Sequence, residues 1–529
     1  MGSTRERGDD MLLPFLSEVQ NKSKKYNVVF RGINYGEGAQ DGEFADTLNL
    51  STAKYPCITQ RAERIKKGQY SAPSTLHAKS SLLVIDGTKV YYGNKELKDL
   101  KVTAGKKQTA TIGNYIVIFP DKKYYKVPTE DNPAGECGDM EETYTAKGLV
   151  FTDSTITITD STITTTGDNF KFRVGDAVKI TGCATAENNQ TIVIRGVAGN
   201  VLTFYENSFT AGEESGSVTI KREVPDLDFI CESNYRLWGT HGNTIFSSAF
   251  GDPLNFFPRE GIAGDGYDIQ VGSEGEFTGC IPYSSHICFF KENTLHKLYG
   301  TKPSNFQINT VNVYGVQSGS ERSMHIVNEQ LLYKGVNGIY AYTGGVPELI
   351  SEKLGDKRYS DAVACCDGET YYISMKQGSN YSLFAYDVAK NIWLREDDTH
   401  AVDMAFYDGS VYFINSEGGL YYIDKTADRS DIEWGATFCT IHETMNERKG
   451  YSKFHLRMDM SAGSWLALDI KTDNDTTWRQ VYTTHNEKAK TVSIPIMPTR
   501  CDSIDIRLRG KGECTIKTFI REFTVGSDV

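Results

Sequence analysis

The sequence predicts an all-β protein: a six- or seven-bladed β-propeller with a small β-barrel-like domain inserted into it, followed by a C-terminal β-sandwich or jelly roll. The 529 residues include 30 tyrosines, 25 phenylalanines and 49 glycines, a composition typical of strands joined by tight turns. A turn-and-strand motif recurs along much of the chain. The recurrence stops twice, and strands that alternate apolar and polar residues replace it. The length also predicts several domains.

The N-terminal part has no repeat of its own. Residues 1–27 are mostly polar and are predicted to form a flexible arm. Residues 28–135 are predicted to hold an entry segment and the first propeller blades. The entry segment, up to Arg61, has the pattern of a strand, a Gly-rich loop and an extended piece. Its strand at Val28–Phe30 is expected to complete the last blade, because a propeller ring needs such a closing strand.

The recurring motif is a turn of Asp-Gly or Asn type between two strands rich in Tyr, Phe, Ile and Val. Examples are "SSLLVIDGTKVYYGNKEL", "CESNYRLWGTHGNTIFSSAF", "VNEQLLYKGVNGIYAYTGG" and "FYDGSVYFINSEGGLYYID". The turns at Asn328, Asp367 and Asp408 are 39 and 41 residues apart. This interval matches a four-stranded propeller blade of about 40–45 residues. Residues 227–426 are therefore predicted to hold the remaining blades.

Residues 136–226 interrupt the repeat. In "DSTITITDSTITTTGDNFKFRVGDAVKITGC", Thr and Ile alternate as they do in half-buried antiparallel strands. The stretch "GVAGNVLTF" is typical of a hairpin. A small β domain inserted at a loop of the propeller explains this segment, since insertions are tolerated there.

Residues 427–529 are predicted to form the C-terminal β-sandwich. In the stretch that begins "YSKFHLRMDM", Phe454, Leu456 and Met458 alternate with His455 and Arg457, so that one face is apolar and the other polar. The strand lengths and turn spacing fit a sandwich or jelly roll.

The charge balance and the cysteines limit the function classes. A formal net charge of −12 offers no basic surface on which nucleic acid would be wrapped. No apolar run approaches the length of a membrane span, and the first residues do not form a secretory signal. The eleven cysteines are scattered without a CxxC pair, which predicts reduced core thiols. The chain is expected to be soluble and made in a cytoplasm.

No catalytic or metal-binding pattern stands out, so the protein is predicted not to be an enzyme and to hold no cofactor or metal. The paired aspartates all lie in polar turns, where Asp caps its own backbone. These pairs are Asp265 with Asp268, Asp397 with Asp398, and Asp473 with Asp475. His241 lies in a Gly-His-Gly-Asn turn between two strands, and zinc, P-loop and GxSxG signatures are missing. A propeller glycosidase is kept as a minor alternative.

Four stretches carry a resemblance to a known family. "RLWGTHGNTIFSSAFGDPLNFF", "CFFKENTLHKLYGTKPSNFQI" and "LLYKGVNGIYAYTGGVPELISEKL" look like successive blades of bacteriophage virion β-propellers. The ending "CDSIDIRLRGKGECTIKTFIREFTVGSDV" is similar to the tails of the same proteins. The closest functional class is the tail hub or nozzle, also called the stabilisation protein, of short-tailed phages. The resemblance covers about residues 28–529 and includes no catalytic residues.

The resemblance implies a structural protein of the virion tail, assembled in the cytoplasm of a bacterial host. Such proteins form a homohexameric ring in the head-tail connector, below the portal and adaptor. The ring retains the packaged genome and provides the exit channel for DNA ejection. Its expected partners are further copies of the chain, the portal and adaptor, and tail proteins such as fibres. Double-stranded DNA would pass through without sequence-specific binding.

Two loops are the candidate contact sites to a neighbouring subunit or the channel. Their residues are Asp252, Pro253 and Asn255 in "GDPLNFF", and Lys302, Pro303 and Ser304 in "TKPSNF". Each also fits a plain blade-connecting turn. The main alternative function is a receptor- or glycan-binding tail protein that uses Trp465 and Trp478 of the C-terminal sandwich as a lectin-like face.

Overall fold

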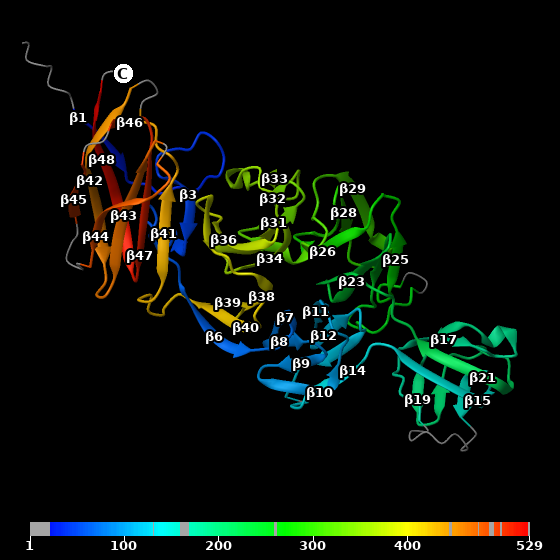
Figure 1. Ribbon diagram of the computed structural model, residues 1–529. Helices are drawn as coiled ribbons and strands as arrows, with labels where there is room; N and C mark the ends of the chain where they lie inside the picture. Colours follow the sequence, from blue (N-terminus) through cyan, green and yellow to red (C-terminus); the bar gives the residue numbers. More distant parts are fainter. Residues whose placement is uncertain are drawn as a thin grey trace, which may run out of the picture. The chain divides into compact units, whose positions relative to one another are not determined.

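The computed structural model describes residues 22–130, 132–158, 169–258, 262–443, 447–473, 475–485, 491–497 and 500–526. Within these ranges the chain is all-β: the helical elements are short 3-10 turns, and strands form the sheets seen in Figure 1. The chain divides into two compact units. Residues 62–427 form one, here named the propeller-like unit, and residues 1–61 with 428–529 form the other, the sandwich unit.

In the part of the chain that the structure describes, the propeller-like unit contains seven four-stranded antiparallel sheets, numbered here along the chain. Six of them are built from four consecutive strands, as the recurring turn motif predicts. The first two sheets are formed by β7 (Pro73–Lys79), β8 (Ser81–Asp86), β9 (Lys89–Tyr92) and β10 (Lys95–Lys101), and by β11 (Gln108–Ile112), β12 (Tyr115–Phe119), β13 (Lys123–Lys126) and β14 (Glu136–Asp139).

The third, fourth and fifth sheets follow the inserted domain. They are formed by β22 (Phe229–Ser233), β23 (Arg236–His241), β24 (Thr244–Ser247) and β25 (Tyr267–Gln270); by β26 (Phe277–Tyr283), β27 (His286–Lys291), β28 (Thr294–Tyr299) and β29 (Gln307–Asn312); and by β30 (His325–Val327), β31 (Gln330–Gly335), β32 (Gly338–Tyr342) and β33 (Glu348–Leu349). The sixth and seventh sheets are formed by β34 (Ser360–Cys366), β35 (Thr370–Gln377), β36 (Asn380–Asp387) and β37 (Ile392–Asp397), and by β38 (Ala401–Tyr407), β39 (Ser410–Asn415), β40 (Gly419–Asp424) and β6 (Glu63–Gln69).

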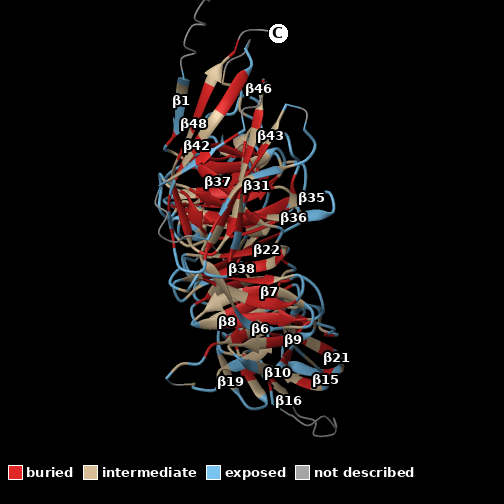
Figure 2. Ribbon diagram, turned by 60° about the vertical axis from the view of Figure 1, so that its left-hand side comes forward, coloured by how far each residue is buried: buried red, intermediate tan, exposed pale blue. Residues whose placement is uncertain are grey.

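The contacts between sheets run in a closed cycle, so the unit is propeller-like. The first strand of one sheet contacts the first strand of the next in most steps, and β38 of the last sheet contacts β7 of the first. Aromatic side chains fill the spaces between sheets. For example, Trp238 packs on Phe289 with ring centroids 6.2 Å apart, and Phe290 packs on Tyr333 at 5.0 Å. Figure 2 shows the strands of this unit as largely buried. Each sheet thus buries its apolar faces against its neighbours.

The closing strand differs from the prediction. Val28–Phe30 does not complete the last sheet, because that place is taken by β6, which pairs antiparallel with β40 from Gly419 opposite Gln69 to Asp424 opposite Glu63. Both strands could satisfy the pattern of an edge strand, and alternation alone does not choose between them. The chain therefore enters the ring about 35 residues later than expected.

The segment between the fourth and fifth sheets lies at the centre of the ring. Its 3-10 turn η3 (Glu321–Ser323) carries Arg322, which forms an ion pair with Asp403 of β38 at 2.9 Å. Arg322 also donates to the carbonyl of Ser74 in β7, at 3.0 Å, and to that of Lys107, at 2.8 Å. One side chain thus joins the first, second and seventh sheets.

Other groups of the same segment contact the fifth and sixth sheets. The backbone N–H of Ala362 donates to Ser320 Oγ at 3.1 Å, and the Tyr371 hydroxyl donates to the carbonyl of Ser323 at 2.6 Å. Lys334 N–H donates to Ser323 Oγ at 2.9 Å. We name residues 317–324 the central segment. It occupies the middle of the ring and crosslinks sheets that are distant in the chain.

The inserted domain is one seven-stranded sheet. Its strand order is β18-β17-β21-β15-β16-β20-β19. The strands are β15 (Glu142–Phe151), β16 (Thr155–Ile158), β17 (Ala177–Thr181), β18 (Thr191–Val193), β19 (Gly196–Ala198), β20 (Val201–Thr203) and β21 (Gly212–Arg222). The predicted start at residue 136 is too early, because β14 pairs with β13 in the second sheet. The domain has its own apolar core, to which Leu149, Ile180 and Leu202 belong.

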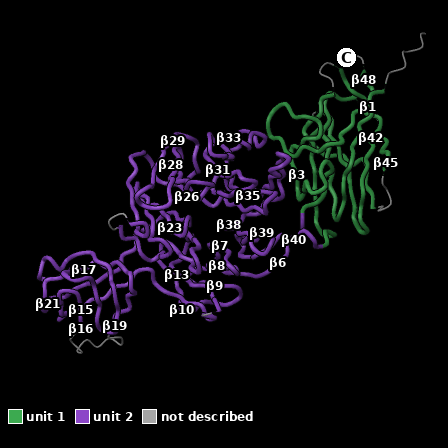
Figure 3. Tube along the Cα trace, turned by 180° about the vertical axis from the view of Figure 1, so that it is seen from behind, with its two compact units in different colours: residues 1–61, 428–529 green, residues 62–427 purple. Residues whose placement is uncertain are grey.

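Among the described residues, the sandwich unit, coloured green in Figure 3, has two large sheets and a two-stranded sheet of β4 (Leu50–Ser51) and β5 (Thr59–Gln60). The five-stranded sheet contains β1 (Lys22–Asn27), β42 (Lys449–Met460), β45 (Thr491–Pro495), β46 (Arg500–Cys501) and β48 (Cys514–Val525). The six-stranded sheet contains β2 (Gly32–Ile33), β3 (Glu43–Leu48), β41 (Glu433–Phe438), β43 (Trp465–Thr472), β44 (Arg479–Thr484) and β47 (Ile504–Lys511). Phe438 of one sheet packs on Phe519 of the other with centroids 5.6 Å apart, so an aromatic core lies between them.

The N-terminal part of the chain belongs to this sandwich and not to the propeller entry, as was expected for residues 28–61. Residues 22–27 of the predicted arm form β1, which pairs antiparallel with β48; residues 1–21 lie outside the described residues. The reason is a fully buried arginine. Arg521 of β48 forms ion pairs with Asp41 at 2.9 Å and Glu443 at 2.6 Å, and donates to Asn27 Oδ1 at 3.1 Å. A buried guanidinium needs such partners, and two of them come from the N-terminal part.

All eleven cysteines are described and carry free thiols, seven of them buried. The adjacent Cys365 and Cys366 follow the expected alternation: Cys365 is buried and Cys366 is half-buried. In the part of the chain that the structure describes, no helix is long and apolar enough to span a membrane.

Candidate functional site

The loop between β24 and β25 carries three of the predicted contact residues. Arg173 of the inserted domain donates from Nη2 to both carboxylate oxygens of Asp252, at 3.2 and 3.1 Å. Asn255 Nδ2 donates to the carbonyl of Gly175 at 3.0 Å, and Pro253 is buried. Asp252 and Asn255 therefore bind the inserted domain of their own chain. Contact of this loop with a neighbouring subunit or a channel stays a prediction.

A second arginine holds this loop in shape. Arg236 of β23 is fully buried and donates to the backbone carbonyls of Ser248, Ala263 and Asp265, at 2.8, 2.6 and 2.5 Å. The turn before it is left-handed at both Asn234 and Tyr235, with φ of 52° and 55°. A left-handed tyrosine is uncommon and costs free energy, so the surrounding contacts must enforce it.

The other predicted loop is simpler. Pro303 and Ser304 lie in the 3-10 turn η2 (Pro303–Asn305), and Lys302 precedes it. Asn305 Oδ1 accepts from the N–H groups of Thr301 and Lys302, each at 3.0 Å, so the loop is capped within itself. The exposed Lys302 and Ser304 make this a plain connecting turn in the isolated chain. Its predicted role between subunits is untested.

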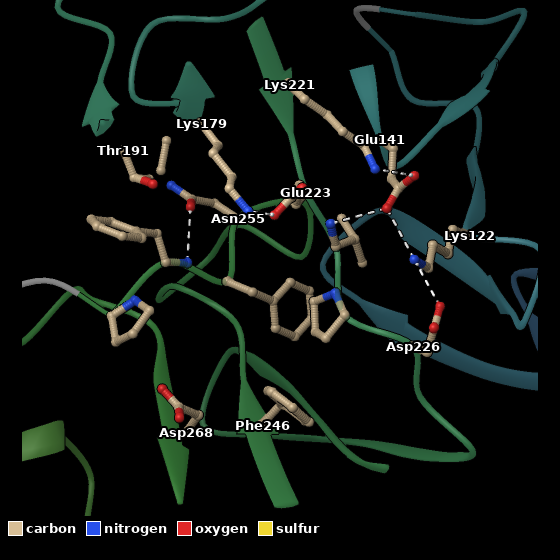
Figure 4. Close-up of a pocket in the computed structure, with 16 residues that line it drawn as sticks. Lys122, Glu141, Lys179, Thr191, Lys221, Glu223, Asp226, Phe246, Asn255 and Asp268 are labelled. Atoms are coloured by element: carbon tan, nitrogen blue, oxygen red, sulfur yellow. Dashed lines mark hydrogen bonds and ion pairs between the residues drawn. The ribbon is translucent and has the colours of Figure 1, made fainter. Parts of the chain in front are cut away.

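A cleft of about 580 Å³ lies between the inserted domain and the second and third sheets (Figure 4). Its apolar lining comes mainly from the loop after β24 and the segment that leaves β21. Its charged lining comes from both bodies. The main lining residues are Lys122, Glu141, Lys179, Lys221, Val224, Pro225, Asp226, Phe246, Phe256, Phe257 and Asp268.

Ion pairs use most of the charged groups of this cleft. Lys122 Nζ lies 2.9 Å from Glu141 Oε1 and 2.8 Å from Asp226 Oδ1, and Lys221 lies 3.5 Å from the other oxygen of Glu141. Lys179 pairs with Glu223 at 3.6 Å. The dashed lines of Figure 4 connect Lys221 to Glu141, Glu141 to Lys122, and Lys122 to Asp226. These contacts link β21 of the inserted domain to Lys122, which directly precedes β13.

These pairs keep the cleft groups charged at neutral pH. Burial acts to raise the pKa of Glu141, but the hydrogen bond and the charge of Lys122 outweigh it and lower the pKa. The hydrogen bond from Lys122 also lowers the pKa of Asp226. The pKa of Lys122 is raised, because its two carboxylates outweigh the effect of burial. General acid or base catalysis needs a group whose pKa is near the working pH. Here the pKa values of the two carboxyl groups are lowered and that of Lys122 is raised, so all three move further from neutral pH. The cleft is chemically suited to holding the inserted domain in place.

The paired aspartates have structural roles, but not all of them lie in turns as predicted, because Asp268 is in β25 and Asp397 ends β37. Asp397 forms an ion pair with Arg64 at 2.6 Å, and Asp398 pairs with Arg395 at 2.5 Å. Asp475 Oδ2 accepts from the N–H of Thr472 at 3.1 Å. These contacts agree with turn and ion-pair roles. Among the described residues, no cluster of three or more His, Cys, Asp or Glu side chains could hold a metal ion.

Three residues of the stretch "RLWGTHGNTIFSSAFGDPLNFF" have structural roles. Trp238 is buried in the core between the third and fourth sheets, and Phe246 lines the cleft. The side chain of His241 is half exposed, and its Nδ1 lies 3.0 Å from Asp228 Oδ2. Arg173 and the central Arg322 were not singled out from the sequence. No local pattern connects Arg173 to Asp252 or Arg322 to Asp403, since each pair is some eighty residues apart and meets only in the fold.

No protein-family model and no curated protein matches the chain. The solved structures that it resembles include the computationally designed protein Ika8, at 10% identity over 68% of this chain and 98% of that chain, with a TM-score of 0.34. BamB from Moraxella catarrhalis is similar at 9% identity over 70% and 98% of the two chains, with a TM-score of 0.33. The N-terminal domain of Nup159 gives 10% identity over 75% and 99%, with a TM-score of 0.25. Similarity at this level assigns no function.

Proposed function

We propose that the chain is a structural subunit of a bacteriophage virion, with the tail hub or nozzle as its class. In this proposal the seven sheets are the blades of one closed propeller, and copies of the chain assemble into a homohexameric ring below the portal and adaptor. The ring retains the packaged genome and provides the DNA exit channel. The chain acts mechanically and carries out no chemistry.

One observation carries the proposal: the three internal stretches that resemble phage virion propellers fall on successive sheets of the ring. They correspond to β23 and β24, to β27 and β28, and to β31 and β32. The fourth stretch corresponds to β47 and β48. The resemblance therefore falls on the two middle strands of three successive sheets, which supports the proposal.

The distribution of charge supports the same function. Residues 225–427 contain 14 lysines and arginines against 26 aspartates and glutamates, whereas residues 62–224 contain 20 of each. The sandwich unit contains 23 of each. The whole net charge of −12 thus lies in residues 225–427, which form the third to sixth sheets and three strands of the seventh. A conduit lined by such a surface would repel the phosphates of passing DNA and would not retain them.

The position of the central segment limits where a DNA channel could run in the proposed assembly. Because Arg322 bridges three sheets at the middle of the propeller, DNA would not use the axis of one chain. In the proposed assembly the channel lies on the axis of the ring of subunits. A heterologous contact repeated about such an axis closes into a ring.

The test is the assembly state of the purified full-length chain, alone and mixed with the portal and adaptor proteins encoded in the same genome. We expect negative-stain images to show rings of six subunits in at least the mixture, and gel-shift titration to detect no retention of duplex DNA. A chain that stays monomeric with both partners present, or that binds DNA tightly, would contradict the proposal.

The second candidate function is a receptor- or glycan-binding tail protein. The observation that favours it is the position of Trp465 and Trp478, which are only partly buried and lie beside exposed basic side chains of the sandwich unit. Ring formation and glycan binding are compatible in one chain, so the two candidates need separate experiments.

A further inference from the structure

The outer side of the six-stranded sheet in the sandwich unit carries a row of aromatic and basic side chains. Strands β43 and β47 pair antiparallel, with Trp465 opposite Lys511 and Asp469 opposite Arg507. Leu468, Ile470 and Leu508 are buried, so the alternating residues between them lie on the outer side. We name the row the outer stripe and define it as Trp465, Lys471, Trp478, Arg507 and Arg509.

Two arginines of the outer stripe are held in place by one buried carboxylate. Asp469 Oδ2 accepts from Arg507 Nε at 3.0 Å and Nη2 at 2.7 Å, and from Arg509 Nε at 2.8 Å. Arg509 Nη2 also donates to Gln480 Oε1 at 2.8 Å. The Asp469 side chain is 2% exposed, whereas those of Arg507 and Arg509 are 32% and 38% exposed. The guanidinium groups are therefore fixed from below and open to solvent.

The carboxylate stays ionised under this arrangement. Burial acts to raise the pKa of Asp469, but the hydrogen bonds from Arg509 and Arg507 outweigh it and lower the pKa. A single negative charge thus holds two guanidinium groups, and each keeps N–H donors beyond those that Asp469 uses. Such pre-organised forks match the geometry of an incoming carboxylate or sulfate.

The tryptophans serve as supports for these cations. Arg507 Cζ lies 4.5 Å from the ring centroid of Trp478, and Lys471 Nζ lies 4.7 Å from the same centroid. Arg509 Cζ lies 5.7 Å from the centroid of Trp465. A cation over an aromatic face is stabilised and immobilised there. Because Arg507 and Lys471 both lie over the ring of Trp478, cations cover a surface on which a neutral sugar would otherwise stack.

We propose that the outer stripe binds an acidic polysaccharide, whose carboxylate or sulfate groups meet Arg507, Arg509 and Lys471. The stripe extends from Trp465 to Lys471, roughly 20 Å along a strand, which suits a chain of sugars more than a single one. The cations exceed the nearby carboxylates, Asp469 and Asp505, by one, and the exposed guanidinium groups provide the complementary charge.

The sandwich unit has 23 basic and 23 acidic residues, so it has no net field to attract a polyanion, whether a polysaccharide or a nucleic acid, from a distance. Recognition must come from contacts in the stripe itself. The proposal does not depend on ring formation, and its failure would leave the proposed structural function untouched.

Binding of the full-length chain to immobilised polysaccharides tests the proposal. The probes are polygalacturonate for carboxylates, dextran sulfate for sulfates, unmodified dextran as the neutral chain, and a short DNA duplex. We expect binding to one or both acidic chains and none to dextran. Preference for polygalacturonate or for dextran sulfate identifies the anionic group. Binding to neither acidic chain, or tighter binding to the duplex, overturns the proposal.

Two variants locate the binding. Arg507→Gln removes the charge and most of the fork, and Lys471→Gln removes a charge without touching Asp469. We expect each to weaken binding about tenfold, since one charge-assisted hydrogen bond is lost. Arg457→Gln is the matched control, because Arg457 is exposed on β42 in the other sheet. If Arg507→Gln unfolds the sandwich unit, polysaccharide binding by the Lys471→Gln variant still tests whether the outer stripe is the binding site. Equal weakening by the control overturns the assignment to the stripe.

Discussion

The two compact units build their sheets in opposite ways. In the propeller-like unit, six of the seven four-stranded sheets come from four consecutive strands, and only the last takes a distant strand, β6. In the sandwich unit, both large sheets combine strands from the two ends of the chain: β1 pairs with β48, and β3 pairs with β41. Local pairing produces a repeat in the sequence, whereas pairing between chain ends produces none.

The two units also differ in charge, but each contains a buried arginine that joins distant segments. The propeller-like unit contains 46 acidic residues against 34 basic ones, and the sandwich unit is balanced. Each unit nevertheless has a buried arginine where distant segments meet, Arg322 at the centre of the ring and Arg521 in the sandwich. Closure of a β structure thus relies here on a buried ion pair, whether the sheets themselves are local or not.

Among the proposed variants, Arg322→Ala is expected to have the largest effect on the stability of the propeller-like unit. The change removes the ion-pair partner of Asp403, whose side chain is only 7% exposed, and the hydrogen bonds to Ser74 and Lys107. Breaking a buried pair costs about 3–5 kcal/mol. We expect the free energy of unfolding of residues 62–427 to fall by this amount, measured by hydrogen exchange with mass spectrometry.

The control is Arg358→Ala, because Arg358 is exposed and donates to Asn337 at the surface. That variant should change the stability by less than about 1 kcal/mol. Arg322→Ala protein with an unchanged exchange pattern in β7 and β38 would show that the central segment does not hold the ring together.

The matching change in the sandwich is Arg521→Ala. It leaves Glu443 buried and unpaired, but Asp41 is half exposed and can be solvated. We therefore expect a loss of about 3 kcal/mol, at the lower end for a buried pair. Faster exchange should appear in β1, β42 and β48, while the propeller-like unit keeps its protection. The exposed Arg457→Ala in β42 serves as its control. Loss of protection in both units would mean that they do not unfold separately.

Acid should affect the propeller-like unit through three histidines. Burial lowers the pKa of His77, His296 and His325 to about 4 in each case. An unfolded histidine titrates near 6.5. The unfolded state therefore takes up protons that the folded state does not, and the stability that is present above about pH 6.5 is lost as the pH falls towards 4. The measurement is the thermal midpoint as a function of pH.

The triple variant His77→Gln, His296→Gln, His325→Gln checks the cause of that pH dependence. It should flatten the curve between about pH 6.5 and 4.5, above the range in which carboxylates titrate. An unchanged slope in the variant would assign the acid sensitivity to other groups.

The smallest expected effect comes from deleting residues 1–25, which removes most of β1. This strand is an exposed edge, and its exposed Lys22 and Lys24 form ion pairs with Glu522, whose side chain is 9% exposed. We expect the sandwich unit to lose about 1–2 kcal/mol, the value of a few edge hydrogen bonds and of ion pairs in which one partner is open to solvent. Faster exchange of β48 with no change in β38–β40 is the predicted readout. Destabilisation of β38–β40 instead would contradict the assignment of the N-terminal strand to the sandwich unit.

The candidate site was predictable only in part. The turn chemistry of "GDPLNFF" identified an ordered loop with Asp252 and Asn255, and the structure brings both to the inserted domain through Arg173 and Gly175. That partnership has no sequence signal, because the contact depends on how the inserted domain packs. The outer stripe was visible only as Trp465 and Trp478. Its arginines and the buried Asp469 become a site through the register of β43 with β47.

By itself, the sequence determined the all-β class and the repeated strand-and-turn units, since alternation and turn residues act over a few neighbouring positions. Only the tertiary structure decided that β6 closes the ring, that β1 to β3 join the sandwich, and that Arg322 fills the centre. These features depend on pairing between strands hundreds of residues apart, or on one buried charge finding its partner. The sequence pattern of an edge strand is the same whichever sheet the strand joins. Its partner is therefore determined by the packing and ion pairs of the folded chain.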